Sequence, residues 1–240
     1  MKSRAILVLL CSCFLCASAQ AYVFEFNSSG SAVVTFDGSS RTFAFSPEDG
    51  TPGPGYGFDF VVTRSEDSTL DGYRGTIAGL FAIGAIDAPG AVVQTAPVTT
   101  SGGLFTLSNL LGDTITATLT WNEIFTRDPG GSTSSGSIEG TVTLSDFTGY
   151  TGADSALAAL AGSDGFITLA FSFVSPGRSL VELTTPGQIH VTGYHGDVTV
   201  APLAAIPEPA MASGVIGLLV LGLAVAMHRT VTHQERDIDE

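Results

Sequence analysis

The chain has 240 residues, 44% of them hydrophobic and only 13% charged, and its formal net charge is −14. A chain this acidic repels nucleic acid and anionic lipid, so no nucleic-acid partner is expected. The length accommodates one main domain between two terminal segments of different character.

Residues 1–19 have the features of a signal peptide. Lys2 and Arg4 precede an apolar run over residues 5–15, and residues 17–19 read Ala-Ser-Ala, a small-residue cleavage pattern. The run is too short for a comfortable transmembrane helix, which is the alternative interpretation. All three cysteines lie in this segment, so a mature chain beginning at Gln20 would have no disulfide and no thiol nucleophile.

Residues 20–203 are expected to form a β-rich exported domain. The clearest strand covers residues 114–121, where four apolar side chains ending at Trp121 alternate with four threonines. This period of two places one face in a core and the other in water. Residues 138–144 show the same alternation, and the Gly-, Ser- and Pro-rich residues 127–135 between the two strands predict a hairpin.

Several further short strands are expected along the domain. They cover residues 22–26, 32–36, 42–45, 58–63, 73–81, 104–107, 166–174 and 198–200, with Asp-Gly turn signals at 37–38, 49–50, 71–72 and 164–165. One short helix is expected over residues 155–161, with Asp154 as its N-cap and Gly162 at its end. The pattern predicts an all-β fold with one short helix, in the form of an antiparallel β-sandwich or jelly-roll-like domain, or a barrel.

The last segment, residues 204–240, is predicted to be a sorting tail with one transmembrane helix. Residues 210–227 carry no charge, and as a helix they would cover roughly 27 Å, enough for a thin bilayer. A buried core helix is the alternative, but the run has no polar face and follows a proline-rich boundary.

Pro207, Glu208 and Pro209 before this span, with Arg229 after it, resemble the PEP-CTERM sorting signal of exported bacterial surface proteins. Two prolines hold the backbone extended, and the charge of Glu208 must stay outside the hydrocarbon. Arg229, as a membrane-stop residue, favours a cytoplasmic C-terminus. The resemblance covers the sorting tail only, and eleven residues follow Arg229, so an anchor that is never cleaved remains the alternative.

The resemblance implies a partner and an address. In this family an exosortase-like membrane enzyme reads the motif and releases the protein towards the surface or an exopolysaccharide matrix. The chain would then be anchored in the inner membrane before processing, and afterwards lie at the cell surface or in the extracellular matrix.

The sequence offers only weak metal candidates. Glu66, Asp67 and Asp71 cluster before a glycine and could supply the hard oxygen ligands of calcium, or simply form a solvated turn. His190 and His195 would point to opposite faces of one regular strand, unless a turn between them brings the pair together. No other cofactor is expected.

No catalytic residue is predicted, because no nucleophile elbow, phosphate-binding loop or HExxH motif is present. The leading hypothesis is a non-enzymatic cell-surface or extracellular-matrix protein. A calcium-assisted polysaccharide-binding module is the alternative, followed by a secreted glycosidase-like hydrolase that uses two carboxylates. Carboxylates about 5–10 Å apart in a cleft would indicate the hydrolase, and a shallow aromatic strip the binding module.

The threonines of residues 114–120 resemble the T-x-T rows of ice-binding β-solenoids. One strand is not an array, however, and threonine is a common residue on exposed strands.

Overall fold

The computed structural model describes residues 21–49, 57–66, 68–89, 93–127, 137–173 and 177–201. The chain divides into residues 1–202 and residues 203–240, and every described residue lies in the first unit. The predicted signal peptide and sorting tail therefore lie outside the described residues. Within those residues, no helix is long and apolar enough to cross a membrane.

The prediction of an antiparallel all-β domain is confirmed. The strands are β1 (Tyr22–Ser28), β2 (Val33–Asp37), β3 (Thr42–Ser46), β4 (Phe60–Ser65), β5 (Arg74–Ile83), β6 (Thr95–Ser108), β7 (Thr114–Arg127), β8 (Ser137–Thr151), β9 (Asp164–Ser172) and β10 (Ile189–Ala201). The helices are α2 (Ser155–Leu160) and α3 (Leu180–Leu183).

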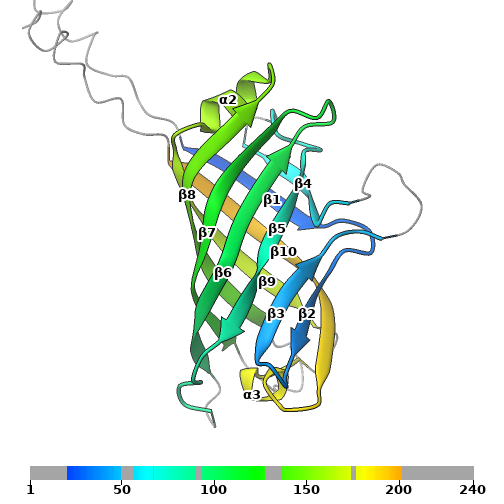
Figure 1. Ribbon diagram of the computed structural model, residues 1–240, viewed down its shortest axis with the longest axis vertical. Coiled ribbons are helices and arrows are strands. Elements are labelled where there is room, and N and C mark those ends of the chain that lie inside the picture. The colour runs from blue at the N-terminus through cyan, green and yellow to red at the C-terminus, as the bar shows by residue number, and fades with distance from the viewer. Residues whose placement is uncertain are drawn as a thin grey trace, which may run out of the picture. The chain divides into compact units, whose positions relative to one another are not determined.

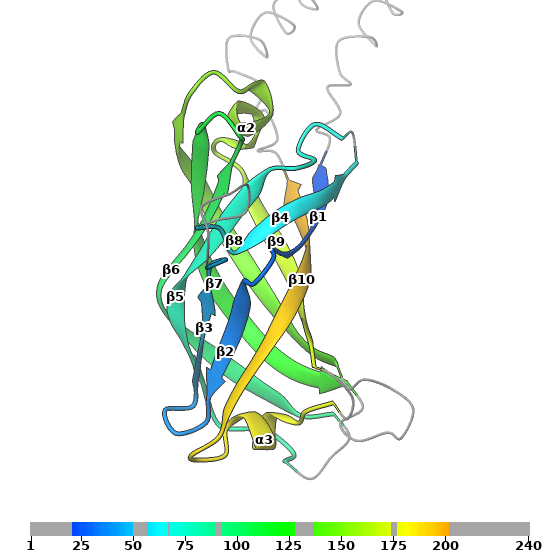
Figure 2. The same cartoon turned by 90° about the vertical axis from the view of Figure 1, so that its right-hand side faces the viewer.

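All ten strands belong to one sheet that closes on itself (Figures 1 and 2). From β5 the ladder runs through β6, β7, β8 and β9 to β10. The circle is completed by two short strand pairs, β4–β1 and β3–β2, which share the remaining edges of β5 and β10. Both β5 and β10 therefore hydrogen-bond to three strands each.

The closed sheet is sandwich-like, because its strands pack across one aromatic core. The ring of Trp121 on β7 lies 5.0 Å from that of Phe43 on β3 and 6.2 Å from that of Phe171 on β9. Phe36 on β2 meets Phe43 at 5.1 Å and Phe171 at 5.3 Å. β7 forms no hydrogen-bonded pair with β3 or β9, and β2 forms none with β9. The Trp121–Phe43, Trp121–Phe171 and Phe36–Phe171 contacts therefore join separate parts of the ladder.

The predicted hairpin of β7 and β8 is confirmed, including its inward face. Trp121 pairs with Val142 and is only 3% exposed, and the apolar residues that alternate with the threonines of β7 are buried. The alternation then changes phase, because the β7–β8 register shifts between Trp121 and Glu123. This bulge turns Ile124 and Thr126 inward.

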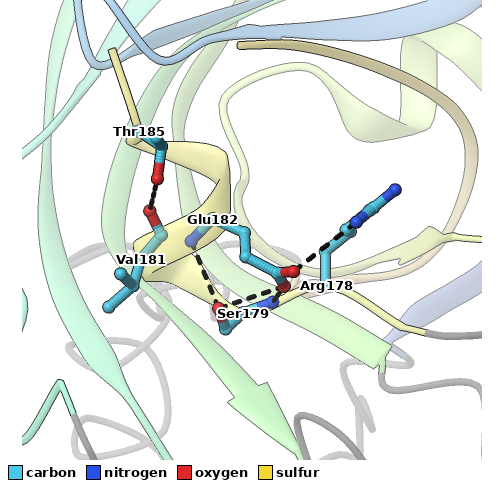
Figure 3. A network of polar contacts seen from close by, with 5 residues as sticks. All are labelled: Arg178, Ser179, Val181, Glu182 and Thr185. Atoms are coloured by element: carbon cyan, nitrogen blue, oxygen red, sulfur yellow. Dashed lines mark hydrogen bonds and ion pairs between the residues drawn. The ribbon is translucent and has the colours of Figure 1, made fainter.

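The predicted helix is confirmed as α2, where Asp154 Oδ1 accepts hydrogen bonds from the amides of Ala156 and Leu157. A second helix, α3, was not predicted. Ser179 Oγ accepts from the amide of Glu182 at 3.2 Å, and Glu182 Oε2 accepts from the amide of Ser179 at 2.8 Å (Figure 3). This reciprocal capping box is visible in the sequence as Ser-x-x-Glu.

The predicted turn at residues 164–165 is wrong. Asp164 and Gly165 are the first residues of β9 and pair with Ala201 and Val200 of β10. A Cβ at position 165 would lie 3.2 Å from the carbonyl oxygen of Thr199, so the glycine serves a close strand contact rather than a turn. The strands expected at residues 104–107 and 198–200 are the ends of the much longer β6 and β10.

We expect Trp121→Ala to lower the free energy of unfolding by about 3–5 kcal/mol, because it empties the centre of the aromatic core. Gly140→Ala on β8 should also lower the free energy of unfolding, since a methyl group there would overlap the Trp121 ring. Thr120→Ala, at the exposed neighbouring position, is the matched control and should cost less than about 1 kcal/mol. Urea denaturation measures all three, and a Trp121→Ala protein as stable as the wild type would contradict the inward phase of β7.

Candidate functional site

The sorting residues Pro207, Glu208, Pro209 and Arg229 lie outside the described residues, so their role stays a prediction. Those of the other candidates that the structure describes fall on strands and turns of the closed sheet.

Two of the suggested calcium ligands, Glu66 and Asp71, lie in the connection between β4 and β5. Asp71 Oδ1 accepts hydrogen bonds from the amide and hydroxyl of Ser65, at 2.6 and 2.9 Å. Glu66 is exposed and Asp67 lies outside the described residues. Among those described, no three His, Cys, Asp or Glu side chains are grouped so that they could hold a metal ion. The carboxylate of Asp71 thus stabilises the turn, and calcium binding here stays a prediction.

The two histidines stay apart, because β10 runs through Gly193 without a turn. His190 lies beside Phe36 of β2 and is partly buried, with no hydrogen-bond partner for its Nε2 atom. His195 points outward beside Asn27 of β1. Opposite faces are what a regular strand predicts.

Two carboxylates approach each other at the end of the sheet that carries α2. The Asn109 amide donates to Asp113 Oδ2 at 3.0 Å and to Asp154 Oδ2 at 2.9 Å, and Tyr73 also donates to Asp154. Partial burial raises the pKa of Asp154, but hydrogen bonds from Tyr73 and Asn109 outweigh it and hold that pKa below its ordinary value. Burial and the contact with Asp154 raise the pKa of Tyr73 to about 12.

Asp154 does not have the raised pKa expected of the acid catalyst in a glycosidase. An acid catalyst needs a carboxyl group whose pKa is raised, whereas Asp154 is held ionised by its donors. Its two oxygens accept four hydrogen bonds, two of them from the amides that begin α2. The cluster therefore links the β4–β5, β6–β7 and β8–β9 connections to one another.

A buried acid, Asp59, lies directly before β4, and its amide donates to the carbonyl oxygen of Gly75 on β5. Its Oδ2 accepts from the amide of Ile77, while its Oδ1 is buried without a partner among the described residues. The backbone oxygen of Asp59 accepts from the Tyr194 hydroxyl at 2.7 Å and from the amide of Ser29 at 3.0 Å. Burial raises the pKa of Asp59 to about 6, so the side chain ionises at a cost near neutral pH.

The outer face of β8, β9, β10 and β1 presents an aromatic side chain to solvent. Phe166 on β9 is 43% exposed, and it is the aromatic member among the exposed large hydrophobic residues that the structure describes. Its direct cross-strand neighbours are Thr143 on β8 and Thr199 on β10. Beyond them the row continues to Thr120 on β7 and Val23 on β1. With strands about 4.8 Å apart, the row spans roughly 19 Å.

A polar row runs beside the Phe166 row, two residues along each strand. Thr168 on β9 lies opposite Asp197 on β10, and Asp197 lies opposite Glu25 on β1. Glu25 also forms an exposed ion pair with Arg64 at 3.5 Å. We name Thr143, Phe166, Thr168, Asp197 and Thr199 the Phe166 face. It combines an apolar ring with hydroxyl and carboxylate groups, which donate and accept hydrogen bonds around it.

The threonines of β7 also extend across neighbouring strands. Thr76, Thr106, Thr116 and Thr148 form one cross-strand row on β5 to β8. The flanking rows are mixed, since one includes Arg74 and the other includes Leu104. The β7–β8 register also shifts on both sides of Thr116. The threonines therefore form a single row rather than the regular two-dimensional array that repeated T-x-T strands would give.

The Phe166 face was not predicted from the sequence, although the sequence does indicate the outward direction of Phe166. Residues 166–172 alternate, with Ile167, Leu169 and Phe171 directed inward and Phe166 directed outward. That alternation places an aromatic residue on a polar strand face. Its neighbours come from β8 and β10, and this pairing depends on the topology.

Comparison of the chain with protein-family models, curated proteins and solved structures finds no match.

We expect the pH dependence of stability to identify Asp59 as the buried acid. A folded pKa of about 6 lies above the ordinary value, so the native state holds a proton that the unfolded state has lost between about pH 4 and 6. This group's contribution therefore falls as pH rises through that range, by about 3 kcal/mol, and is constant above it.

Asp59→Asn removes this titration while it keeps an oxygen to accept from Ile77. The variant should match the wild type near pH 4 and be the more stable protein at pH 8. Urea denaturation from pH 4 to pH 8 measures both. If the two stability curves run parallel over that range, Asp59 does not titrate as described.

Proposed function

We propose that this protein is an exported, non-enzymatic component of the cell surface or extracellular matrix. Its β-sandwich or jelly-roll-like domain is delivered through the PEP-CTERM-like tail and contacts a hydroxyl-rich polysaccharide through the Phe166 face. The observation that carries the second part is the exposed Phe166 ring between two threonines on adjacent strands.

The Phe166 face is suited to a sugar polymer by its chemistry and by its rigidity. The ring offers an apolar surface, while Thr143 and Thr199 offer hydroxyls within one strand spacing on either side. β9 is hydrogen-bonded on both edges, to β8 and β10, so the backbone that carries these side chains is held in place. Little conformational entropy is then lost on binding.

The charge of the protein restricts the class of polysaccharide. The chain carries a net charge of −14, and Asp197 and Glu25 lie directly beside the Phe166 row. An anionic polymer would be repelled, whereas the hydroxyls of a neutral polymer can donate to these carboxylates. We therefore expect a preference for neutral chains.

Delivery depends on the tail. Pro207 and Pro209 deny helical hydrogen bonds to the segment just before the apolar run, and Glu208 carries a charge that hydrocarbon excludes. An extended, charged motif at the outer interface is a suitable recognition element for a membrane-embedded enzyme. The signal peptide predicted at the other terminus supplies the export that such sorting requires.

Phe166→Ala should weaken binding to a neutral polysaccharide about tenfold, since the ring supplies the apolar contact. Retardation in gels that contain the soluble polymer measures the affinity. Leu80→Ala is the matched control, because Leu80 is a similarly exposed apolar residue on β5. Equal retardation of the Phe166→Ala and wild-type proteins would rule out this face as the binding surface.

Changing Pro207, Glu208 and Pro209 together to Ala should trap the protein in the inner membrane. The helix can then extend upstream and the charged, extended element is lost, but the span still anchors the chain. Fractionation, with mass spectrometry of both termini, is the measurement in a host that has an exosortase. The wild type should lose the residues beyond about 210 and reach the surface or the medium. If both proteins fractionate alike with intact C-termini, the tail is only an anchor.

A further inference from the structure

The turn between β6 and β7 carries two adjacent leucines in solvent. Leu110 is 71% exposed and Leu111 is 89% exposed, the highest values among the large hydrophobic residues that the structure describes. Neither packs against the aromatic core. A hairpin turn normally carries polar residues, so this pair is unexpected for a surface that faces only water.

The turn holds the leucines in an outward position. Asn109 Oδ1 accepts hydrogen bonds from the amides of Leu111 and Asp113, both at 2.9 Å. The Asn109 amide donates in turn to Asp113 and to Asp154, the N-cap of α2. These hydrogen bonds stabilise the turn in the conformation that leaves both leucine side chains in solvent.

Helix α2 adds exposed apolar side chains at this end of the sheet. The amide of Ala153, just before α2, donates to Asp113 Oδ2 at 3.3 Å, which ties the helix to the leucine turn. The exposed side chains of α2 include Ala158 and Ala159, and Figure 1 shows α2 at the end where β8 finishes and β7 begins. We name Leu110, Leu111, Ala158 and Ala159 the leucine end.

The chain leaves the sheet at this same end. Ala201, the last residue of β10, pairs with Asp164, the first residue of β9, shortly after α2. Eight residues, 202–209, separate Ala201 from the predicted span. Fully extended, they reach at most about 29 Å. Any bilayer that holds residues 210–227 therefore lies within a short tether of the end that carries the leucines.

We infer that the leucine end rests on zwitterionic lipid headgroups of the membrane that anchors the tail. This inference depends on the proposed anchoring. Two leucines bind a bilayer weakly on their own, but a short tether raises their effective concentration at the surface. Their side chains would enter the headgroup region to a depth of about 5–10 Å. The acidic chain restricts this contact to zwitterionic lipid, since anionic headgroups repel it.

A single-cysteine probe tests the contact in the full mature chain, whose sequence from residue 20 contains no cysteine. Leu111→Cys is labelled with a polarity-sensitive fluorophore, and the protein is reconstituted through its tail into phosphatidylcholine vesicles. Gln188→Cys is the matched control, because it is exposed beside the start of β10 at the opposite end of the sheet. The Leu111 probe should shift to shorter wavelength and lose emission when the lipid carries a shallow nitroxide. The control probe should do neither.

A second reporter separates the leucines from the label. A fluorophore at Ala159→Cys should also be quenched by nitroxide lipid, and Leu110→Ser with Leu111→Ser should abolish that quenching. Flotation of the vesicles checks the anchor independently. Protein that floats with both probes unquenched overturns the lipid contact and leaves the anchoring intact. A wavelength shift without lipid quenching indicates contact between protein copies and also overturns it. Protein that does not float overturns both the contact and the proposed anchor.

Discussion

The hydrogen bonding of β10 to three strands is the interaction on which the rest of the structure depends. One edge of β10 pairs with β9, while the other pairs first with β2 and then with β1. Without these pairs the ladder would remain open, with unpaired amides and carbonyls along its edges. Closure also fixes the direction of every side chain, because a strand paired on both edges has one face in the core and one in water.

The inner and outer faces consequently have separate roles. Inside, Trp121, Phe43 and Phe171 join strands that share no hydrogen bonds. Outside, closure aligns residues from β8, β9 and β10 into the row centred on Phe166. At the α2 end, Asp154 fastens the helix, the β6–β7 turn and the start of β5 together. That polar cluster also supports the turn that carries the leucine end.

The sequence predicted those parts of the fold that depend on local pattern. The alternation up to Trp121 and the Asp154 cap of α2 follow from strand period and helix capping, and both were found. The bulge at Glu123 was not, because it depends on how β8 aligns with β7. The first half of β6 was not predicted, because Pro97 disfavours a strand. In the structure Pro97 lies in β6 at the point where the β6–β7 register is interrupted. Of the candidate site, the outward direction of Phe166 was readable, whereas its threonine neighbours and the hydrogen bonds of Asp71 required the three-dimensional arrangement.

The union of the first and last strands has a consequence for how the domain folds. Tyr22 pairs with Val200, residues that are 178 positions apart (200 − 22). Pairing over so long a separation closes a large loop before its contacts form, which makes folding slow. The sheet cannot close until the residues of β10 are available, so the core stays open while the preceding strands are being made. On the export route that we propose, the chain would therefore travel unfolded and close its sheet only as its predicted anchor reaches the bilayer.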